Sequence, residues 1–204
     1  MFMKIRSEGS FACVLATLFA IAAMLAVALP LGVATAGEKL EFSMQPSSAA
    51  ISACLPQASG EVTIETGDLN DKMNVRVSGL APNTGYDLFV IEIPHGPFGI
   101  SWYQSDLQTD KHGRGHAAVR GVFDVETFSV SPVGSPTVSF PPTHQYHLGL
   151  WFNDPQVPFD LGCEPAGQMT PSVTPFNGEQ HAGIQVLNTA NFPDNAGPLS
   201  QIHR

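Results

Sequence analysis

The chain has 204 residues, of which 18 are acidic and 9 are basic, so its formal net charge at pH 7 is −9. An acidic surface repels phosphate backbones, and this charge balance therefore argues against nucleic acid as a partner. The length and the 43% content of hydrophobic residues are enough for one domain with its own apolar core.

The first 36 residues have the pattern of a signal peptide. Lys4 and Arg6 give a positive start, residues 11–29 form an uncharged apolar run, and Ala34 and Ala36 place small side chains where a signal peptidase reads them. We predict cleavage after Ala36, export, and no membrane association of the processed chain. A run of this length could instead remain as an anchor, because about 20 apolar residues span a bilayer.

The remaining 168 residues, 37–204, carry 7 basic and 17 acidic side chains once Lys4, Arg6 and Glu8 are left out. They contain two cysteines, Cys54 and Cys163, which export would place in an oxidising compartment. We predict a disulfide between them. The alternative is a pair of free thiols or metal ligands, although no further cysteine or nearby histidine completes a ligand cluster.

Hydrophobic residues in this part of the chain recur with a period of two, and no segment shows a convincing helical period. The alternation predicts strands with one wet face, whereas residues 86–93 are apolar at both parities and predict a strand covered on both faces. The predicted strands lie at residues 40–44, 62–64, 73–77, 86–93, 101–109, 114–122, 125–130, 145–152 and 184–188. Nine short strands separated by Gly, Pro and Asn predict an all-β fold, an antiparallel β-sandwich of the immunoglobulin or fibronectin kind.

Residues 162–204 are rich in Pro and Gly, which prevent regular strand pairing. We expect this tail to be a loop-rich wrap around a single sandwich domain that spans residues 37–204. A disordered tail is the alternative, but it would leave four apolar side chains without burial: Phe176, Ile184, Val186 and Phe192.

Two turns have recognisable chemistry. The stretch LAPNTGY, Leu80 to Tyr86, resembles the Leu-x-Pro-x-Thr-x-Tyr corner of fibronectin type III domains, a resemblance that implies a Tyr hydroxyl bonded back to the backbone. The stretch TDKHGRG predicts a hairpin connection over residues 109–115, with Asp110 starting the turn and Gly113 at a positive φ. His112 is then an exposed residue at the tip.

Three phrases, IPHGPFGISWYQ, LGLWFN and TPFNGEQHAGIQVLNT, resemble a group of uncharacterised secreted bacterial β-sandwich proteins. The resemblance implies export and the sandwich, and it implies no activity.

The aromatic residues near the HGPFG turn give the sharpest functional hypothesis. In residues 145–152 the even positions form an apolar face, so Trp151 and His147 point to the other side of the strand. If Trp151 and Trp102 meet the Pro97-Phe98 turn, they form an exposed aromatic platform for a sugar ring or a partner protein. The candidate ligand-binding residues are His95, Phe98, Trp102, Tyr103, His147, Trp151, Asn153 and Asp154. The competing interpretation is that a second sheet or the tail covers them and that the turn is a structural connection.

Metal ligation and catalysis find little support in the motifs. His144 and His147 are three apart, which places them on opposite faces of a strand, and no histidine lies between Cys163 and Met169 as a blue-copper site needs. The sequence has no nucleophile elbow, zinc-protease motif or phosphate-binding glycine loop. Four carboxylates could in principle pair across loops, but we assign them to the solvated surface: Glu92, Asp106, Asp124 and Asp154. The Asp- and Asn-rich stretches are explained by turn chemistry.

We therefore predict a secreted or cell-surface binding module, without catalytic residues, cofactor or metal, whose ligand is a protein or a carbohydrate. The alternatives are an extracytoplasmic copper- or zinc-binding protein and a small secreted hydrolase.

Overall fold

The computed structural model describes residues 37–123, 129–131, 133–139, 146–177 and 180–202. The predicted signal peptide lies outside these ranges. So do Asp124, His144 and most of the strand predicted at residues 125–130.

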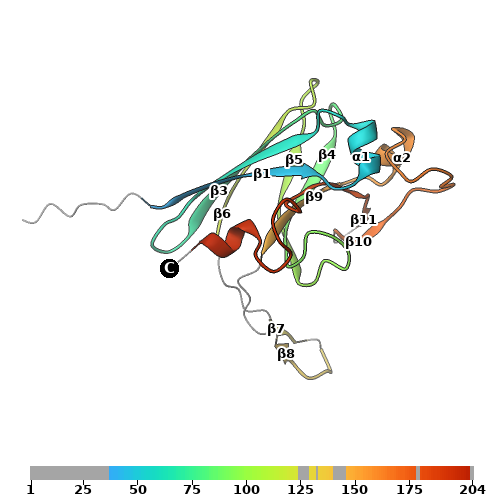
Figure 1. The fold of residues 1–204 in the computed structure, drawn as a ribbon. Helices are drawn as coiled ribbons and strands as arrows, with labels where there is room; N and C mark the ends of the chain where they lie inside the picture. Colours follow the sequence, from blue (N-terminus) through green and yellow to red (C-terminus); the bar gives the residue numbers. More distant parts are fainter. Residues whose placement is uncertain (1–36, 124–128, 132, 140–145, 178–179, 203–204) are drawn as a thin grey trace, which may run out of the picture. The chain divides into compact units, whose positions relative to one another are not determined.

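Eight strands form one antiparallel sheet in the order β5-β4-β9-β12-β1-β2-β3-β6 (Figure 1). Eight of the nine predicted strands recur within a few residues of their expected bounds. The described end of the ninth, predicted at residues 125–130, is also a strand. The sheet strands are β1 (Lys39–Pro46), β2 (Ser59–Glu65), β3 (Asp71–Ser78), β4 (Gly85–Ile91), β5 (Ser101–Gln108), β6 (Gly115–Gly121), β9 (His147–Phe152) and β12 (Gln185–Asn188).

Two helices and two hairpins complete the described residues. The helices α1 (Ala49–Cys54) and α2 (Gln156–Asp160) were not expected, because six and five residues are too short to display a helical period. Ser48 caps α1 by accepting a hydrogen bond from Ile51 N at 3.2 Å. The remaining elements are β7 (Ser129–Val130), β8 (Val138–Ser139), β10 (Thr174–Asn177), β11 (Gln180–Ala182) and the 3₁₀ turn η1 (Pro198–Gln201).

The large sheet is nearly closed. Its edge strands β5 and β6 follow one another in the chain, and they are joined by a hairpin that contains the bridge between Thr109 and Gly115. The predicted antiparallel all-β class is therefore confirmed, whereas the division into the two sheets of a sandwich is not. β12, near the end of the chain, lies between β9 and β1, so the tail supplies a central strand as well as loops.

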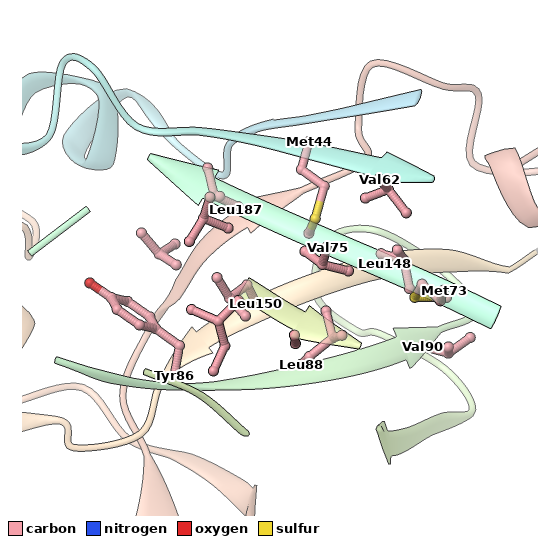
Figure 2. Close-up of a cluster of buried hydrophobic side chains, with 14 of the residues drawn as sticks. Met44, Val62, Met73, Val75, Tyr86, Leu88, Val90, Leu148, Leu150 and Leu187 are labelled. Atoms are coloured by element: carbon pink, nitrogen blue, oxygen red, sulfur yellow. The ribbon is translucent and has the colours of Figure 1, made fainter. Parts of the chain in front are cut away.

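The core fills the inner face of this sheet (Figure 2). The residues expected at inward parity are buried there, including Tyr146, Leu148, Leu150 and Phe152 of β9 and its lead-in. The tail contributes Val186 and Leu187, both fully buried, to the same cluster. Alternation with period two therefore predicted the inner face correctly for most strands.

The tyrosine corner is present. The Tyr86 hydroxyl accepts a hydrogen bond from Ala81 N at 3.0 Å, and burial raises the pKa of Tyr86 well above its usual range. Beside it, Thr84 N donates to Thr109 Oγ1 at 2.9 Å, and the Thr109 hydroxyl donates to Ala81 O at 2.7 Å. The corner and the end of β5 are thus joined by buried polar contacts whose partners are all supplied by the chain.

The hairpin over residues 109–115 also has the predicted chemistry. Asp110 Oδ1 accepts hydrogen bonds from His112 N and Arg114 N at 2.7 and 3.0 Å, and these contacts lower the pKa of Asp110. Gly113 has φ of 69°, and a Cβ there would lie 2.1 Å from Leu80 O. Both the conformation and the close approach require glycine at this position. His112 is exposed, as expected.

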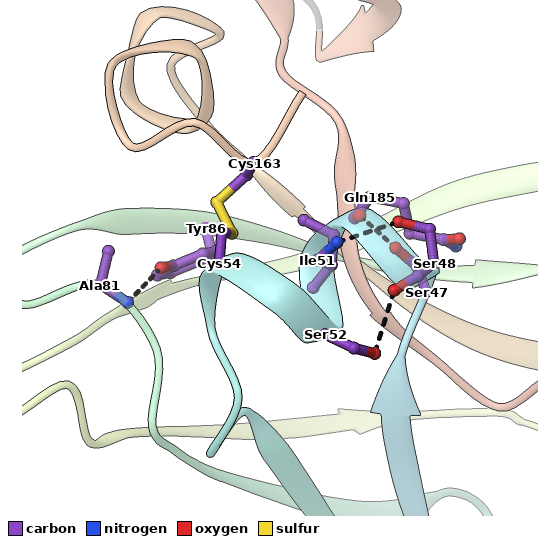
Figure 3. Close-up of a disulfide and its surroundings, with 9 residues drawn as sticks. All are labelled: Ser47, Ser48, Ile51, Ser52, Cys54, Ala81, Tyr86, Cys163 and Gln185. Carbon is purple, nitrogen blue, oxygen red and sulfur yellow. Dashed lines mark hydrogen bonds between the residues drawn. A yellow bond between two sulfur atoms is a disulfide. The ribbon is translucent and has the colours of Figure 1, made fainter. Parts of the chain in front are cut away.

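The predicted disulfide joins Cys54 and Cys163, whose Cα atoms are 5.2 Å apart and which are separated by 109 positions in the sequence (Figure 3). It fastens the end of α1 to the segment that follows α2. In the chain-entropy model, closing a loop of this length contributes about 4–5 kcal/mol to stability.

Candidate functional site

A row of aromatic side chains covers part of the outer face of the sheet. The rings of Tyr103, Phe89, Trp151 and Phe98 follow one another edge to face, with centroid distances of 5.7, 5.6 and 5.0 Å. Phe89, Ile91, Trp151 and Ala182 form a buried cluster separate from the main core, and Phe98 packs against it. Such edge-to-face pairs stabilise a packed surface beyond their buried area.

Trp151 lies inside this cluster and is fully buried. Its indole occupies the space over Gly149, where an added Cβ would come within 2.3 Å of the ring. The outward parity predicted for Trp151 is confirmed. The Phe98 loop and Ala182 cover the ring, so for Trp151 the competing interpretation of a covered aromatic residue is correct and the exposed platform is not.

Trp102 lies on the other face of the sheet. Leu88 pairs with Ser105 and Phe89 with Tyr103, so β5 has one extra residue, Gln104, at this point. This bulge reverses the alternation, and Trp102 consequently packs edge to face on Tyr146 at 4.7 Å. Trp102 and Trp151 therefore lie on opposite faces of the sheet and do not form one exposed platform, so the platform hypothesis is wrong.

Two predicted site histidines are held by the tail. His147 is fully buried, with Nδ1 at 2.9 Å from Thr189 Oγ1 and Nε2 at 3.3 Å from Asp194 O. Burial lowers the pKa of His147, which favours the neutral ring. His95 is exposed, and its Nε2 lies 2.9 Å from Asp194 Oδ2.

A cleft of about 360 Å³ lies beside Phe98 and His95. Its walls come from the start of α1, the loop over residues 92–100, the segment after the disulfide and the start of β12. The lining residues are Ser47, Ser48, Ala50, His95, Gly96, Phe98, Cys163, Glu164, Pro165, Ser172, Ile184 and Gln185. We refer to this site as the Glu164 cleft.

The loop over residues 92–100 is fixed by hydrogen bonds at several points. Glu92 N donates to Ile100 O at 2.9 Å, and Ile100 N donates to the Glu92 carboxylate at 2.9 Å. Gly99 has φ of 67° and packs so closely on Glu92 that a Cβ would lie 2.4 Å from the carboxylate. Glu92, which the sequence assigned to solvated surface, thus organises the loop that carries Phe98.

Gln185, which lines the Glu164 cleft, is oriented by a chain of amide contacts. Ala190 N donates to Asn188 Oδ1 at 3.1 Å, which leaves Asn188 Nδ2 to donate to Pro94 O at 3.0 Å and to Gln185 Oε1 at 2.9 Å. This chain of contacts assigns the orientation of both amides. Gln185 Nε2 is therefore the free end of the amide, and it is buried without a hydrogen-bond partner among the described residues.

Glu164 contributes an acceptor. Its Oε1 accepts a hydrogen bond from Ser172 N at 3.1 Å. Its Oε2 is buried and has no hydrogen-bond partner in the described part of the chain. Neither Glu164 nor Gln185 was a predicted site residue, because only the folding of the tail brings them together. An acidic residue next to the disulfide cysteine was the only hint in the sequence.

The cleft contains two of the eight predicted site residues, His95 and Phe98. Trp151 packs edge to face against Phe98 but does not line the cleft. Trp102, Tyr103 and His147 are also absent from the cleft lining. Partial burial and the neighbouring Asp106 raise the pKa of Tyr103, which is half exposed, to about 12.

Asn153 and Asp154 lie outside the Glu164 cleft. Asn153 Nδ2 donates to Asp87 Oδ1 at 2.9 Å and borders a smaller pocket of about 190 Å³ near Gln108. Asp154 Oδ1 accepts a hydrogen bond from Gln156 N at 2.8 Å at the start of α2. Both side chains have local structural contacts that account for their positions.

The serines and the histidine of the cleft have identified hydrogen-bond partners. The Ser47 hydroxyl donates to Gln185 O, and the Ser48 hydroxyl oxygen accepts from Ile51 N (Figure 3). His95 is paired with Asp194 and not with a serine. Within the described ranges, no group of three or more His, Cys, Asp or Glu residues is placed to hold a metal ion.

Comparison with protein-family models gives no match to this chain, and comparison with curated proteins finds none that is similar.

Proposed function

We propose that this chain is an exported, non-catalytic binding protein that holds a small ligand in the Glu164 cleft. The observation that carries the proposal is the cleft itself, about 360 Å³ in volume, whose described lining combines the apolar side chains of Phe98 and Ile184 with the polar side chain of His95. Small-molecule sites are concave, mostly apolar, and carry a few polar groups that orient the ligand.

The walls of the cleft are also held in place by contacts within the chain. The Cys54–Cys163 disulfide ties the wall formed by α1 to the wall that carries Glu164. The Phe98 wall rests on Trp151, and Asn188 fixes Pro94. A site whose walls are held in place loses less conformational entropy when it binds a ligand.

The exported location remains part of the proposal. It is supported by the predicted signal peptide and by the disulfide, a bond that persists in oxidising compartments. No helix of the described residues is long and apolar enough to cross a membrane. We further propose that the nearly closed sheet is a variant of the β-sandwich found in the secreted bacterial group that the sequence resembles.

Filling the cleft tests the proposal. Ala50 lines the cleft, whereas Ala53 is exposed on the same helix. Ala50→Phe should abolish binding and Ala53→Phe should preserve it. Backbone amide NMR shifts would be measured with four probes: methyl glucoside, arginine, acetate and N-methylacetamide.

We expect at least one probe to shift the amides of cleft residues in the parent protein and in Ala53→Phe, but not in Ala50→Phe. Thermal unfolding checks that both variants fold, and Gln185→Glu replaces Ala50→Phe if the latter does not. The proposal fails if no probe shifts these amides, or if filling the cleft leaves the shifts unchanged.

A further inference from the structure

We infer that residues 190–197 form a strap that the buried ring of His147 holds closed, and that protonation of this ring releases the strap together with the His95 side of the Glu164 cleft. The inference goes beyond the proposed function, because it describes a movement of the chain itself. Its test uses no ligand, so its failure and the failure of the proposed function are separate results.

The strap connects two parts of the chain that are firmly packed. β12, which precedes the strap, is paired with β9 on one side and with β1 on the other. The segment that follows it places Leu199 and Ile202 in the main core. Between these anchors, residues 190, 191 and 193–196 are exposed. A segment with few buried contacts between fixed ends can open locally while the sheet stays folded.

His147 lies at the start of β9 and is covered by the strap. A Cβ on Gly197 would lie 2.7 Å from the imidazole ring, so the strap backbone packs directly on it. The ring contacts Asp194 O through Nε2 at 3.3 Å and Thr189 Oγ1 through Nδ1 at 2.9 Å. A carbonyl oxygen only accepts hydrogen bonds, so Nε2 carries the proton and Nδ1 accepts from the Thr189 hydroxyl. The closed strap therefore uses both nitrogens of a neutral ring.

Protonation of His147 disrupts these contacts. A charged ring carries a proton on both nitrogens, so Nδ1 no longer accepts from Thr189. Thr189 Oγ1 already accepts from Leu148 N at 3.1 Å, and its hydroxyl would have to turn to Leu148 O, which is 3.5 Å away. The buried charge would also lose its hydration, and this cost lowers the pKa of His147. Both effects favour a state in which the strap leaves and water reaches the ring.

The neighbouring charged groups oppose this release only in part. The Asp194 carboxylate on the strap raises the pKa of His147, but by less than burial lowers it. The same carboxylate lies 2.9 Å from His95 Nε2, so acidic pH would place two cationic rings beside one carboxylate. The contact between His95 and Asp194 is exposed, and exposed pairs contribute little to stability. On the side of β4, Ile91 is paired with His147, and the next residue, Glu92, uses its carboxylate within its own loop.

Release of the strap would loosen one wall of the cleft. Asp194 contacts His95, and His95 lines the cleft. A second contact to the same loop, from Asn188 Nδ2 to Pro94 O at 3.0 Å, comes from β12 and stays with the sheet. We therefore expect the loop to loosen at His95 and to remain attached at Pro94. The His95 side of the cleft is then closed at neutral pH and open at acidic pH.

Amide hydrogen exchange followed by NMR between pH 7.5 and 5 tests the inference, with each rate divided by the intrinsic rate at that pH. Two amides report on the strap: Phe192 N donates to Thr189 O and Ala196 N donates to Pro193 O. Ile93 N, which donates to Phe98 O at 3.1 Å, reports on the cleft wall. The amides of β3 report on global unfolding.

Three variants separate the contributions. His147→Gln removes the titrating ring. His112→Gln makes the same change at the exposed hairpin tip and is the matched control. His95→Ala removes the contact between the strap and the cleft wall.

In the parent, protection of the strap amides should fall by up to about tenfold per pH unit below about pH 6.5, because the open state binds a proton that the closed state does not. Protection of the Ile93 amide should fall with it, whereas β3 should keep its protection. His112→Gln should behave as the parent does, and His147→Gln should remove the pH dependence. In His95→Ala the strap should still respond to pH, while the Ile93 amide should be weakly protected at every pH.

Equal strap protection at pH 7.5 and pH 5 in the parent overturns the inference, and so does a pH dependence that His147→Gln retains. A parallel loss of protection in β3 would show global unfolding in place of strap release. A strap response without any change at Ile93 would refute the link to the cleft. If His147→Gln does not fold, the ring-proton titration of His147 in the parent replaces it: strap protection must stop falling at the pH where this ring titrates, and unrelated midpoints refute the inference.

Discussion

The tyrosine corner and the Glu164 cleft differ in how their buried polar groups are satisfied. At the corner, the hydroxyls of Tyr86 and Thr109 and the backbone of Ala81 and Thr84 satisfy one another. Among the side chains that line the cleft, Glu164 Oε2 and Gln185 Nε2 are buried and have no hydrogen-bond partner within the described residues. A closed polar network stabilises the fold, whereas unmatched buried polar atoms cost it free energy.

The largest effect is expected at Trp151, which packs behind the Phe98 wall of the cleft. Trp151→Ala removes a fully buried aromatic ring and should lower the free energy of unfolding by about 3–5 kcal/mol. Denaturant unfolding measures the change, with Tyr103→Ala as a control because Tyr103 lies at the exposed end of the same aromatic row. A loss below about 0.5 kcal/mol would mean that the ring is exposed and does not support Phe98.

The second-largest effect is expected in the hydrogen-bond network of the tyrosine corner. Tyr86→Phe removes the hydroxyl and leaves the buried Ala81 N–H without its acceptor, which should cost about 1–3 kcal/mol of stability. Tyr103→Phe removes a half-exposed hydroxyl and should change stability by less than about 0.5 kcal/mol. Equal effects of the two substitutions in denaturant unfolding would argue that the corner is not a satisfied buried network.

The distance in sequence between the contributing residues explains why the corner could be predicted from the sequence and the cleft could not. The corner depends on seven consecutive residues, Leu80 to Tyr86, and its chemistry is local. The cleft depends on Glu164 and Gln185, which are 21 positions apart, and on a tail whose loops have no period to analyse. His95 and Phe98 were identified because the turn that carries them is a local feature.

The errors in the aromatic platform have equally specific causes. Period-two alternation assigned Trp151 to the outer face correctly, but alternation says nothing about what covers a face. The extra residue Gln104 in β5 moved Trp102 to the inner face, and bulges have no reliable signal in a single sequence. The short helices α1 and α2 lie below the length at which a period can be detected.

A smaller, pH-dependent effect is expected from His147, the buried histidine that joins β9 to the tail. Its pKa is lowered in the folded protein, so below about pH 6.5 the unfolded chain binds a proton that the folded chain does not. Stability should therefore be fully present above the unfolded pKa and fall as the pH decreases through the folded pKa, by no more than about 1.4 kcal/mol per pH unit.

Chemical denaturation between pH 7.5 and 5 would be compared for the parent, His147→Gln and His112→Gln. The slope attributable to this histidine should disappear in His147→Gln and persist in His112→Gln, because His112 is exposed at the hairpin tip. An identical slope in all three proteins would show that the buried ring does not determine the pH dependence.

The smallest effect on stability is expected for Glu164→Gln, a substitution at one of the unmatched polar groups. Glu164→Gln keeps an oxygen for the Ser172 N–H and removes only an atom that has no partner among the described residues. Because no hydrogen bond among the described residues is lost and one unmatched polar atom replaces another, the free energy of unfolding should change by less than about 0.5 kcal/mol. Tyr86→Phe, which breaks a satisfied contact, provides the matched comparison in the same denaturation experiment. A loss of about 1 kcal/mol or more in Glu164→Gln would contradict this expectation and would show that Glu164 Oε2 has a stabilising role in the folded chain.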